Sequence, residues 1–206
     1  MLIKIIKQCR TAFTIAIFLA YGPLTMADQQ PIGAELVLDN FTDSSGTSTF
    51  GTQWVGFTDQ VMGGLSDMAL SYRLNEDDHL SLWLRGEVRL ENNGGFIQAR
   101  LPVERGGRRL DAKDYTGIRI ITRAKPGAYY IHLRTRATWL PWQYYGARIP
   151  VTGGDEWQTH DIPFTAFKGE STRRQLDIRQ IKSIALVAYG EAFSADIELR
   201  YISLYR

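Results

Sequence analysis

Hydrophobic and polar residues alternate with a period of two along much of the chain after about residue 35. In the segment 79–85 three leucines share one side, at positions 80, 82 and 84, while histidine, serine, tryptophan and arginine occupy the other. The segments 95–101 and 129–136 repeat this alternation. Strands that bury one face and expose the other have this pattern, so the sequence predicts antiparallel β-sheets.

Further strands are predicted at short and regular intervals, over residues 35–40, 117–123, 144–151, 157–162, 181–189 and 194–204. Turns rich in glycine and proline separate them. No long amphipathic helix is predicted; the segments 164–168 and 176–180 fit single turns, and the loop 168–174 is expected to be mobile. The fold class that follows is all-β, a two-sheet antiparallel jelly-roll sandwich forming a single domain over residues 35–206.

The first 27 residues have the features of a secretory signal. Three basic residues precede an apolar run over residues 12–21, and Thr25-Met26-Ala27 places small residues where a signal peptidase cuts. A retained N-terminal anchor is the alternative interpretation of the apolar run. We therefore predict a signal peptide over residues 1–27, a flexible lead-in over 28–34, and an exported protein, periplasmic or secreted.

Charge and cysteine content narrow the classes of partner. Three of the 24 basic residues and none of the 22 acidic ones lie in residues 1–27, so the remainder carries a net charge near −1. Such a chain has no general attraction to nucleic acid. The one cysteine, Cys9, also lies in the predicted signal, which leaves no disulfide and no thiol nucleophile after cleavage. We expect no nucleic-acid partner and a peripheral rather than integral relation to membranes.

Two segments place a glycine pair beside short polar residues: Asp59-Gln60-Val61-Met62-Gly63-Gly64-Leu65-Ser66 and Asn92-Asn93-Gly94-Gly95-Phe96. Glycine pairs occur where the backbone takes positive φ or where two segments approach closely, and Asp and Asn close turns. One interpretation is a small polar pocket with Asp59 as a binding residue. The other is a loop junction that fixes how two sheets meet.

These segments, together with Trp54, with Trp157 ahead of Ile162-Pro163-Phe164, and with the closing run 193–202, resemble the complex I intermediate-associated protein 30 family. The resemblance spans roughly residues 38–205. It implies a galactose-binding-like β-sandwich without established enzymatic activity. Mitochondrial members act as assembly chaperones for respiratory complex I on the matrix side, so the resemblance also implies a protein partner, a membrane complex among the candidates. Predicted export places this chain in a different compartment.

Two groups of residues are candidates for binding. The first is a polar strand face with Arg100, Arg119, Arg123, His132, Arg134 and Arg136, together with Trp83 and Tyr130, in which several guanidinium groups would share a face with aromatic rings if the strands pair in one sheet. Arginine binds carboxylates and phosphates in bidentate geometry and stacks on rings. The alternative is a solvated face whose cations pair with Glu87, Glu91 and Glu104.

The second group is the aromatic segment 139–145, in which Trp139, Trp142 and Tyr144 are the candidates. Exposed Trp and Tyr rings are suited to stacking on sugars and to protein hot spots, whereas buried ones belong to the core.

Catalytic and metal signatures are weak. Asp39, Asn40 and Asp43 could meet Asp196 and Glu198 around a calcium ion if the first and last strands are neighbours, but their spacing matches no defined loop. No zinc spacing, nucleophile elbow, triad or cofactor motif is present in the sequence, so we predict no catalytic residue, no metal and no cofactor. The leading hypothesis is a non-catalytic binding or assembly module that engages a protein or an envelope component. The alternative is a carbohydrate-binding module that uses residues 139–145, and an enzyme acting on an anionic sugar comes third.

Overall fold

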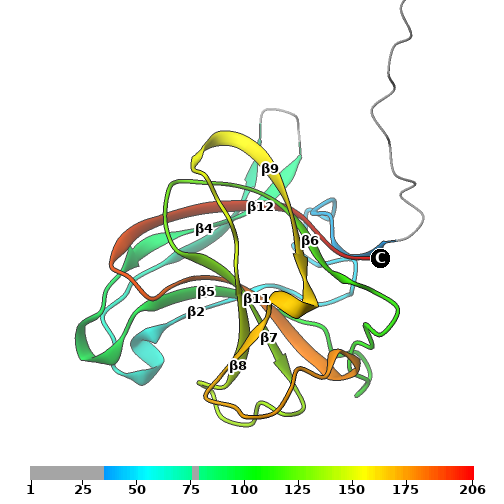
Figure 1. Ribbon diagram of the computed structural model, residues 1–206. Coiled ribbons are helices and arrows are strands. Elements are labelled where there is room, and N and C mark those ends of the chain that lie inside the picture. Colours follow the sequence, from blue (N-terminus) through cyan, green and yellow to red (C-terminus); the bar gives the residue numbers. More distant parts are fainter. Residues whose placement is uncertain (1–34, 76–78) are drawn as a thin grey trace, which may run out of the picture. The chain divides into compact units, whose positions relative to one another are not determined.

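The computed structural model describes residues 35–75 and 79–206. The predicted signal peptide and lead-in lie outside this range and stay predictions. Within it, all strands belong to two antiparallel sheets, drawn one above the other in Figure 1. The predicted all-β sandwich is therefore confirmed.

The first sheet has the order β3-β4-β12-β6-β9, and β1 also pairs with β12. Its strands are β1 (Leu36–Asp39), β3 (Ala69–Leu74), β4 (Leu80–Val88), β6 (Gly117–Ala124), β9 (Gly154–Pro163) and β12 (Phe193–Tyr205).

The second sheet has the order β10-β8-β7-β11-β5-β2. Its strands are β2 (Val55–Thr58), β5 (Phe96–Pro102), β7 (Tyr129–Thr135), β8 (Tyr144–Arg148), β10 (Lys168–Glu170) and β11 (Ile181–Tyr189). Short 3-10 helices connect strands, namely η2 (Asp59–Met62), η3 (Glu91–Asn93), η4 (Phe164–Ala166) and η5 (Ile178–Gln180). The last two fall in the segments where single turns were predicted.

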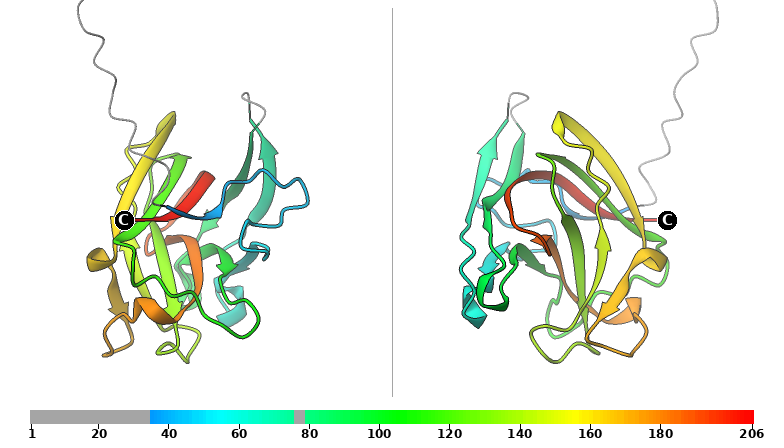
Figure 2. Two further views of the ribbon diagram at one scale, coloured as in Figure 1. Left: turned by 90° about the vertical axis from the view of Figure 1, so that its right-hand side faces the viewer. Right: turned by 60° about the vertical axis from the view of Figure 1, so that its left-hand side comes forward.

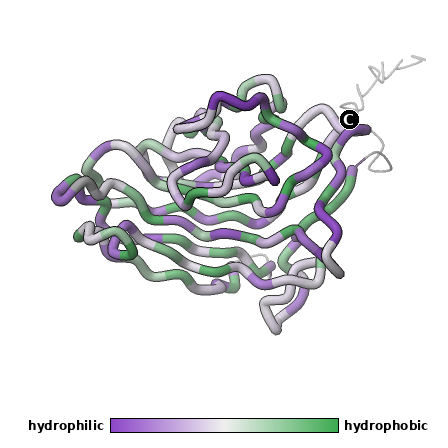
Figure 3. The backbone as a smooth tube through the Cα atoms, turned by 90° about the horizontal axis from the view of Figure 1, so that it is seen from below, coloured by the Kyte–Doolittle hydropathy of each residue, from purple (hydrophilic) through white to green (hydrophobic). Residues whose placement is uncertain are grey.

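The core lies between the two sheets and is built from the hydrophobic positions of the alternating pattern. Buried and half-buried residues alternate along all of β5 and along β6 from Ile118 onward, and Figure 3 shows hydrophobic and hydrophilic positions alternating along neighbouring strands. Leu82 and Ile120 of the first sheet and Ile131 and Leu186 of the second are fully buried. Each such side chain stabilises the fold by about 1.5–3 kcal/mol relative to exposure.

Strand β12 is the longest and lies between β4 and β6. A register shift between Leu199 and Tyr201 adds one residue, so Ile197 and Leu199 before it and Ile202 after it all face the core. β1 pairs with the end of β12, so the first and last strands lie side by side (Figure 2).

All nine predicted strands are present, and three further strands were not predicted. β2, β3 and β10 lie at sheet edges and are exposed over most of their length. Because an edge strand buries little of either face, it need not alternate. Residues 168–170, predicted to be part of a loop, form a strand that pairs with β8; the mobility of the segment 168–174 stays a prediction. In the described part of the chain, no helix has the length and apolar character needed to cross a membrane.

Candidate ligand-binding face

Asp59 sits where the two glycine-rich segments meet. Its side chain is fully buried at the start of η2 and accepts hydrogen bonds from the backbone N–H of Ser66 (3.0 Å), Gly95 (2.6 Å) and Phe96 (3.3 Å) and from the Ser66 hydroxyl (2.5 Å). Burial acts to raise the pKa of Asp59, but these donors outweigh it and hold the pKa below its ordinary value. Both carboxylate oxygens are therefore occupied by partners within the protein.

Two glycines make room for this carboxylate. A Cβ at Gly64 would lie 2.7 Å from the Asp59 Cβ, and one at Gly94 would lie 2.5 Å from Asp59 Oδ2. Ser66 also joins the first sheet, because its hydroxyl accepts a hydrogen bond from the Arg89 N–H (2.9 Å) beyond the end of β4. The structure thus supports the loop-junction interpretation, since the Asp59 contacts link the ends of both sheets.

The arginines predicted to share one face are divided between the sheets. Arg119 and Arg123 lie on β6 and Trp83 lies on β4, all in the first sheet. Arg100 lies on β5, and His132 and Arg134 on β7, in the second sheet. The condition of a single sheet therefore holds for Arg100, His132 and Arg134 but not for Arg119, Arg123 and Trp83. Alternation assigns a residue to the polar side of its strand but not to a sheet.

Ion pairs between arginines and carboxylates lie on the outer face of the first sheet. Glu198 is buried and accepts hydrogen bonds from Ser81 (2.8 Å), Arg73 (3.3 Å) and Arg123 (3.0 Å). Arg119 bonds Asp161 (2.7 Å) and Glu35. These carboxylates are not the predicted Glu87, Glu91 and Glu104, but they serve the same purpose of neutralising the arginines.

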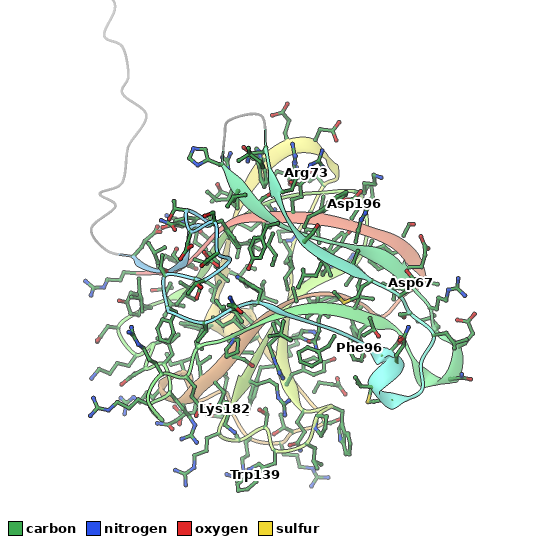
Figure 4. The ribbon with its side chains drawn as sticks, turned by 180° about the vertical axis from the view of Figure 1, so that it is seen from behind. Asp67, Arg73, Phe96, Trp139, Lys182 and Asp196 are labelled. Carbon is green, nitrogen blue, oxygen red and sulfur yellow. The ribbon has the colours of Figure 1, made fainter. Side chains whose placement is uncertain are left out.

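Asp196 belongs to the same network. It accepts a hydrogen bond from Trp83 Nε1 (2.7 Å) and pairs with Lys125 (3.1 Å). Arg73 and Arg85 lie over the Trp83 ring, at 5.0 and 4.2 Å. Figure 4 shows Arg73 and Asp196 in the upper part of the domain, with Trp139 at the opposite end.

Two open hollows, of about 440 and 330 Å³, lie over this network and share Lys125 and Asp196. Arg73, Arg123, Lys125, Asp196 and Glu198 along them already form ion pairs.

The outer side of the second sheet, the second-sheet face, is aromatic and basic. Cross-strand register places its side chains in rows across the strands. One row contains Gly146, His132, Ala185, Arg100 and Val55, and the next contains Arg148, Tyr130, Val187, Gln98 and Phe57. The central strand β11 supplies small side chains and its two neighbours supply large ones. Sequence reasoning did not identify Tyr189, Arg148 or Phe57 as candidates.

His132 lies at the centre of a cluster of rings. It stacks on Tyr144 with ring centroids 3.8 Å apart and an interplanar angle of 12°, and Tyr130 and Tyr189 stand edge-on or tilted beside it at about 6 Å. Gly146 lies directly opposite His132 and leaves space for the imidazole. His132 is only 7% exposed, and its Nε2 has no hydrogen-bond partner among the described residues. Burial lowers the pKa of His132 to about 3, so the imidazole is neutral.

Tyr144 and Tyr189 extend this cluster. Burial, followed by a side-chain hydrogen bond with Tyr189, raises the pKa of Tyr144. Tyr189 could have been identified from sequence, because it continues the alternation of Ser183, Ala185 and Val187 along β11. The predicted Tyr144 therefore lies beside the predicted His132, although 12 residues separate them.

Arg100 and Arg134 flank β11 on the same face. Arg100 lies over the Phe57 ring at 4.4 Å, and Arg134 donates to the carbonyl oxygens of Leu140 (2.8 Å) and Thr138 (3.3 Å). Partial burial lowers the pKa of both arginines, and the nearby charge of Arg100 lowers that of Arg134 further. Arg136 follows β7 in an exposed turn, outside these rows.

The aromatic segment 139–145 divides between surface and core. Trp139 and Trp142 are 78% and 51% exposed in the loop between β7 and β8, where Gln143 Oε1 accepts the Trp139 N–H (2.9 Å). Tyr145 is buried and donates to the Arg174 carbonyl oxygen (2.9 Å). The exposed tryptophans thus lie at one end of the second sheet, next in sequence to Tyr144 of its outer face.

The carboxylates considered for calcium do not converge. β1 and β12 are neighbours, but Asp39 lies opposite Ile202, near the other end of β12 from Asp196. Asp39 accepts hydrogen bonds from the Phe41 N–H and from Trp54 Nε1, both at 2.8 Å. Over residues 35–75 and 79–206, no group of three or more His, Cys, Asp or Glu side chains is arranged to hold a metal ion.

Comparison with solved structures places the fold among carbohydrate-binding modules. The family 11 module of a cellulosomal cellulase of Clostridium thermocellum matches with a TM-score of 0.63 at 15% identity, covering 83% of this chain and 94% of that one. The same family's module from that organism, in complex with a β-1,3-1,4-mixed-linked tetrasaccharide, matches with a TM-score of 0.61 at 15% identity, over 84% and 95%. A family 30 carbohydrate-binding module gives 0.52 at 15% identity, over 69% and 92%.

Sequence comparison identifies the family. No curated protein matches the chain by sequence. The family model described as complex I intermediate-associated protein 30 matches residues 40–200, a range that includes both glycine-rich segments and every strand from β2 to β11. The chain therefore belongs to the complex I intermediate-associated protein 30 family.

Proposed function

We propose that this domain is a non-catalytic binding module that holds an oligosaccharide on the second-sheet face. The observation that carries the proposal is the ring cluster of Tyr130, His132, Tyr144 and Tyr189, which lies on the outer side of three adjacent strands rather than in the core. Flat rings beside hydrogen-bonding groups suit a sugar, whose C–H faces stack while its hydroxyls bond.

The solved structures support this choice of ligand. One of the similar folds is a carbohydrate-binding module in complex with a tetrasaccharide, although at 15% identity the likeness carries the fold and not the residues. The loop with Trp139 and Trp142 would extend the face by two exposed rings.

Direct binding to a glycan panel tests the proposal. We expect intrinsic tryptophan fluorescence or calorimetry to detect at least one oligosaccharide, and Tyr144→Ala to weaken its affinity about tenfold or more, as expected for a central contact worth more than about 1.4 kcal/mol. Trp157→Ala is the matched control, because Trp157 lies on β9 of the first sheet between Arg123 and Arg200. A panel without any binding, or equal losses from both variants, would refute the proposal.

A protein partner is the second candidate, favoured by the exposed Trp139, Leu140 and Trp142 at the end of the same sheet. Tryptophan is over-represented among residues that dominate protein interfaces, and the family's description names association with complex I intermediates. A photo-crosslinking residue at position 140 should capture one defined protein, and the Trp139→Ala and Trp142→Ala double variant should lose it. Crosslinks that persist in the double variant would argue against this interface.

A further inference from the structure

We infer that the oligosaccharide is acidic, and that its negatively charged group binds between Arg100 and Arg134 on the second-sheet face. The inference rests on the proposed function and specifies its class of ligand. Carboxylate and sulfate groups share the chemistry that recognises them, namely a negative charge with oxygen acceptors for the planar guanidinium fork.

The two arginines are positioned to act on one group. Arg100 lies directly opposite Ala185, and Arg134 lies opposite Ser183, so they flank neighbouring outward positions of the central strand β11. Strands two apart are separated by roughly 10 Å, and the charge of Arg100 is near enough to lower the pKa of Arg134. In the free protein Arg100 lies over Phe57 of β2 and Arg134 reaches the carbonyl oxygens of Thr138 and Leu140, so both side chains would turn toward a bound anion. Ala185 and Ser183 between them are small and buried, so the anion would contact the guanidinium groups and not β11.

Their positive charges are not compensated within the protein. Arg73, Arg119 and Arg123 of the first sheet each pair with a carboxylate. Across residues 35–75 and 79–206, neither Arg100 nor Arg134 lies within ion-pair distance of an acidic group. Arg85 and Arg200 of the first sheet lie over tryptophan rings instead.

Leaving these charges unpaired is unfavourable in the free protein. Both guanidinium groups are half-buried and close to one another, and like charges in a partly desolvated site repel. Carbonyl oxygens of Thr138 and Leu140 orient Arg134 without cancelling its charge. The Arg100 guanidinium lies over the Phe57 ring and makes no hydrogen bond to any described residue, so its side-chain N–H donors are free for a ligand. An anion bound between the two would remove the repulsion and use these donors.

His132 and its ring cluster lie beside the two arginines. His132 is two residues before Arg134 on the same side of β7, and it lies across Ala185 from Arg100. Its Nε2 is enclosed against Gly146 of β8, on the side of β7 away from Arg100, so this atom does not face the anion. The flat rings of the cluster can stack on a sugar, which suits a sugar that bears an acidic group better than a free inorganic anion.

Matched pairs of ligands test the inference. Oligosaccharides of galacturonate, glucuronate and mannuronate are each compared with their carboxyl-reduced forms, and a sulfated oligogalactan with its desulfated form, by calorimetry on the intact protein. We expect at least one acidic member to bind about tenfold or more tightly than its neutral counterpart. The uronate and sulfate arms distinguish which anion is preferred.

Variants assign the preference to residues. Arg100→Gln and Arg134→Gln should each bring the ratio of acidic to neutral affinity close to one, whereas Arg85→Gln, which removes the same charge from the first sheet, should leave the ratio unchanged. Because removing either charge relieves repulsion, both variants should keep the melting temperature of the wild-type protein, and the acidic ligand should raise it only in the wild type and Arg85→Gln.

Three results would overturn the inference, and they differ in whether the proposed function survives. Equal affinities for acidic and neutral members would refute it while leaving the proposed function intact. Absence of binding to every member of all four pairs, together with a glycan panel without any binding, would remove both. A preference that Arg85→Gln reduces as strongly as Arg134→Gln would also overturn it, since general electrostatic attraction would then explain the effect.

Discussion

The pH dependence of stability should be dominated between pH 7.5 and 5 by the burial of His132. Burial lowers the pKa of His132 from its ordinary value of 6.5 to about 3, so in this range the unfolded chain binds a proton that the folded protein does not. Stability therefore falls as the pH drops below the unfolded pKa, and the loss continues until the folded pKa is reached. At pH 5, which is 1.5 units below the unfolded pKa, the loss from this one group is about 2 kcal/mol.

Urea unfolding at several pH values measures this loss. Wild type is compared with His132→Gln, because other titrating groups then cancel in the difference between the two free energies of unfolding. Asp59 and His160, whose pKa values are also lowered, would otherwise contribute. We expect the difference to change by about 2 kcal/mol between pH 7.5 and 5.

A second variant, His79→Gln, serves as the control, since His79 is exposed just before β4. It shows whether a change seen for His132→Gln is specific to the buried position. A constant difference for His132→Gln would refute the reasoning, because it would show that its imidazole gains a proton as readily in the folded protein as in the unfolded chain.

Three further substitutions test other parts of the fold by thermal and urea unfolding. Gly64→Ala should cost about 1–3 kcal/mol, because the added methyl group would collide with Asp59; wild-type stability would contradict the close approach. Trp54→Phe removes the donor to the buried Asp39 and should cost about 1–3 kcal/mol; in an Asp39→Ala background, which has no acceptor, the same substitution should cost less, and an equal cost in both backgrounds would contradict a role for the bond. Glu198→Gln should cost about 1–3 kcal/mol, reduced from the value for a fully buried pair because its arginine partners are partly exposed, and high salt should shrink the difference if the pairs are screened.

Alternation in the sequence predicts the central strands well and the edge strands poorly. Residues 181–189 match β11 at both ends, and 117–123 match β6 within one residue. The physical reason is that central strands bury a full hydrophobic face, whereas β2 and β3 are largely exposed and carry no such signal. The alternation of hydrophobic and polar residues reflects the burial of one face, so it is weak in strands that bury little of either face.

Individual residues of the candidate site could be predicted from the sequence, but their arrangement on one sheet face could not. The sequence places Arg100, His132 and Arg134 on the polar sides of their strands, and the structure puts them on one face. The structure also places Arg119 and Arg123 in the other sheet, a separation that the alternating pattern could not predict. Sheet membership depends on the order in which distant strands pair, and that order is set by contacts across the whole core.

Hydrogen bonds connect the glycine-rich junction to the strands that carry the second-sheet face. Asp59 follows β2 directly, and it bonds the N–H groups of Gly95 and Phe96 at the start of β5. Phe57 of β2 supports the Arg100 guanidinium, and Arg100 lies on the same side of β5 as Phe96. The Asp59 contacts therefore hold together the two strands that position one of the two anion-binding arginines. Asp59 thus acts on the binding face through the backbone, without a contact of its own to the ligand.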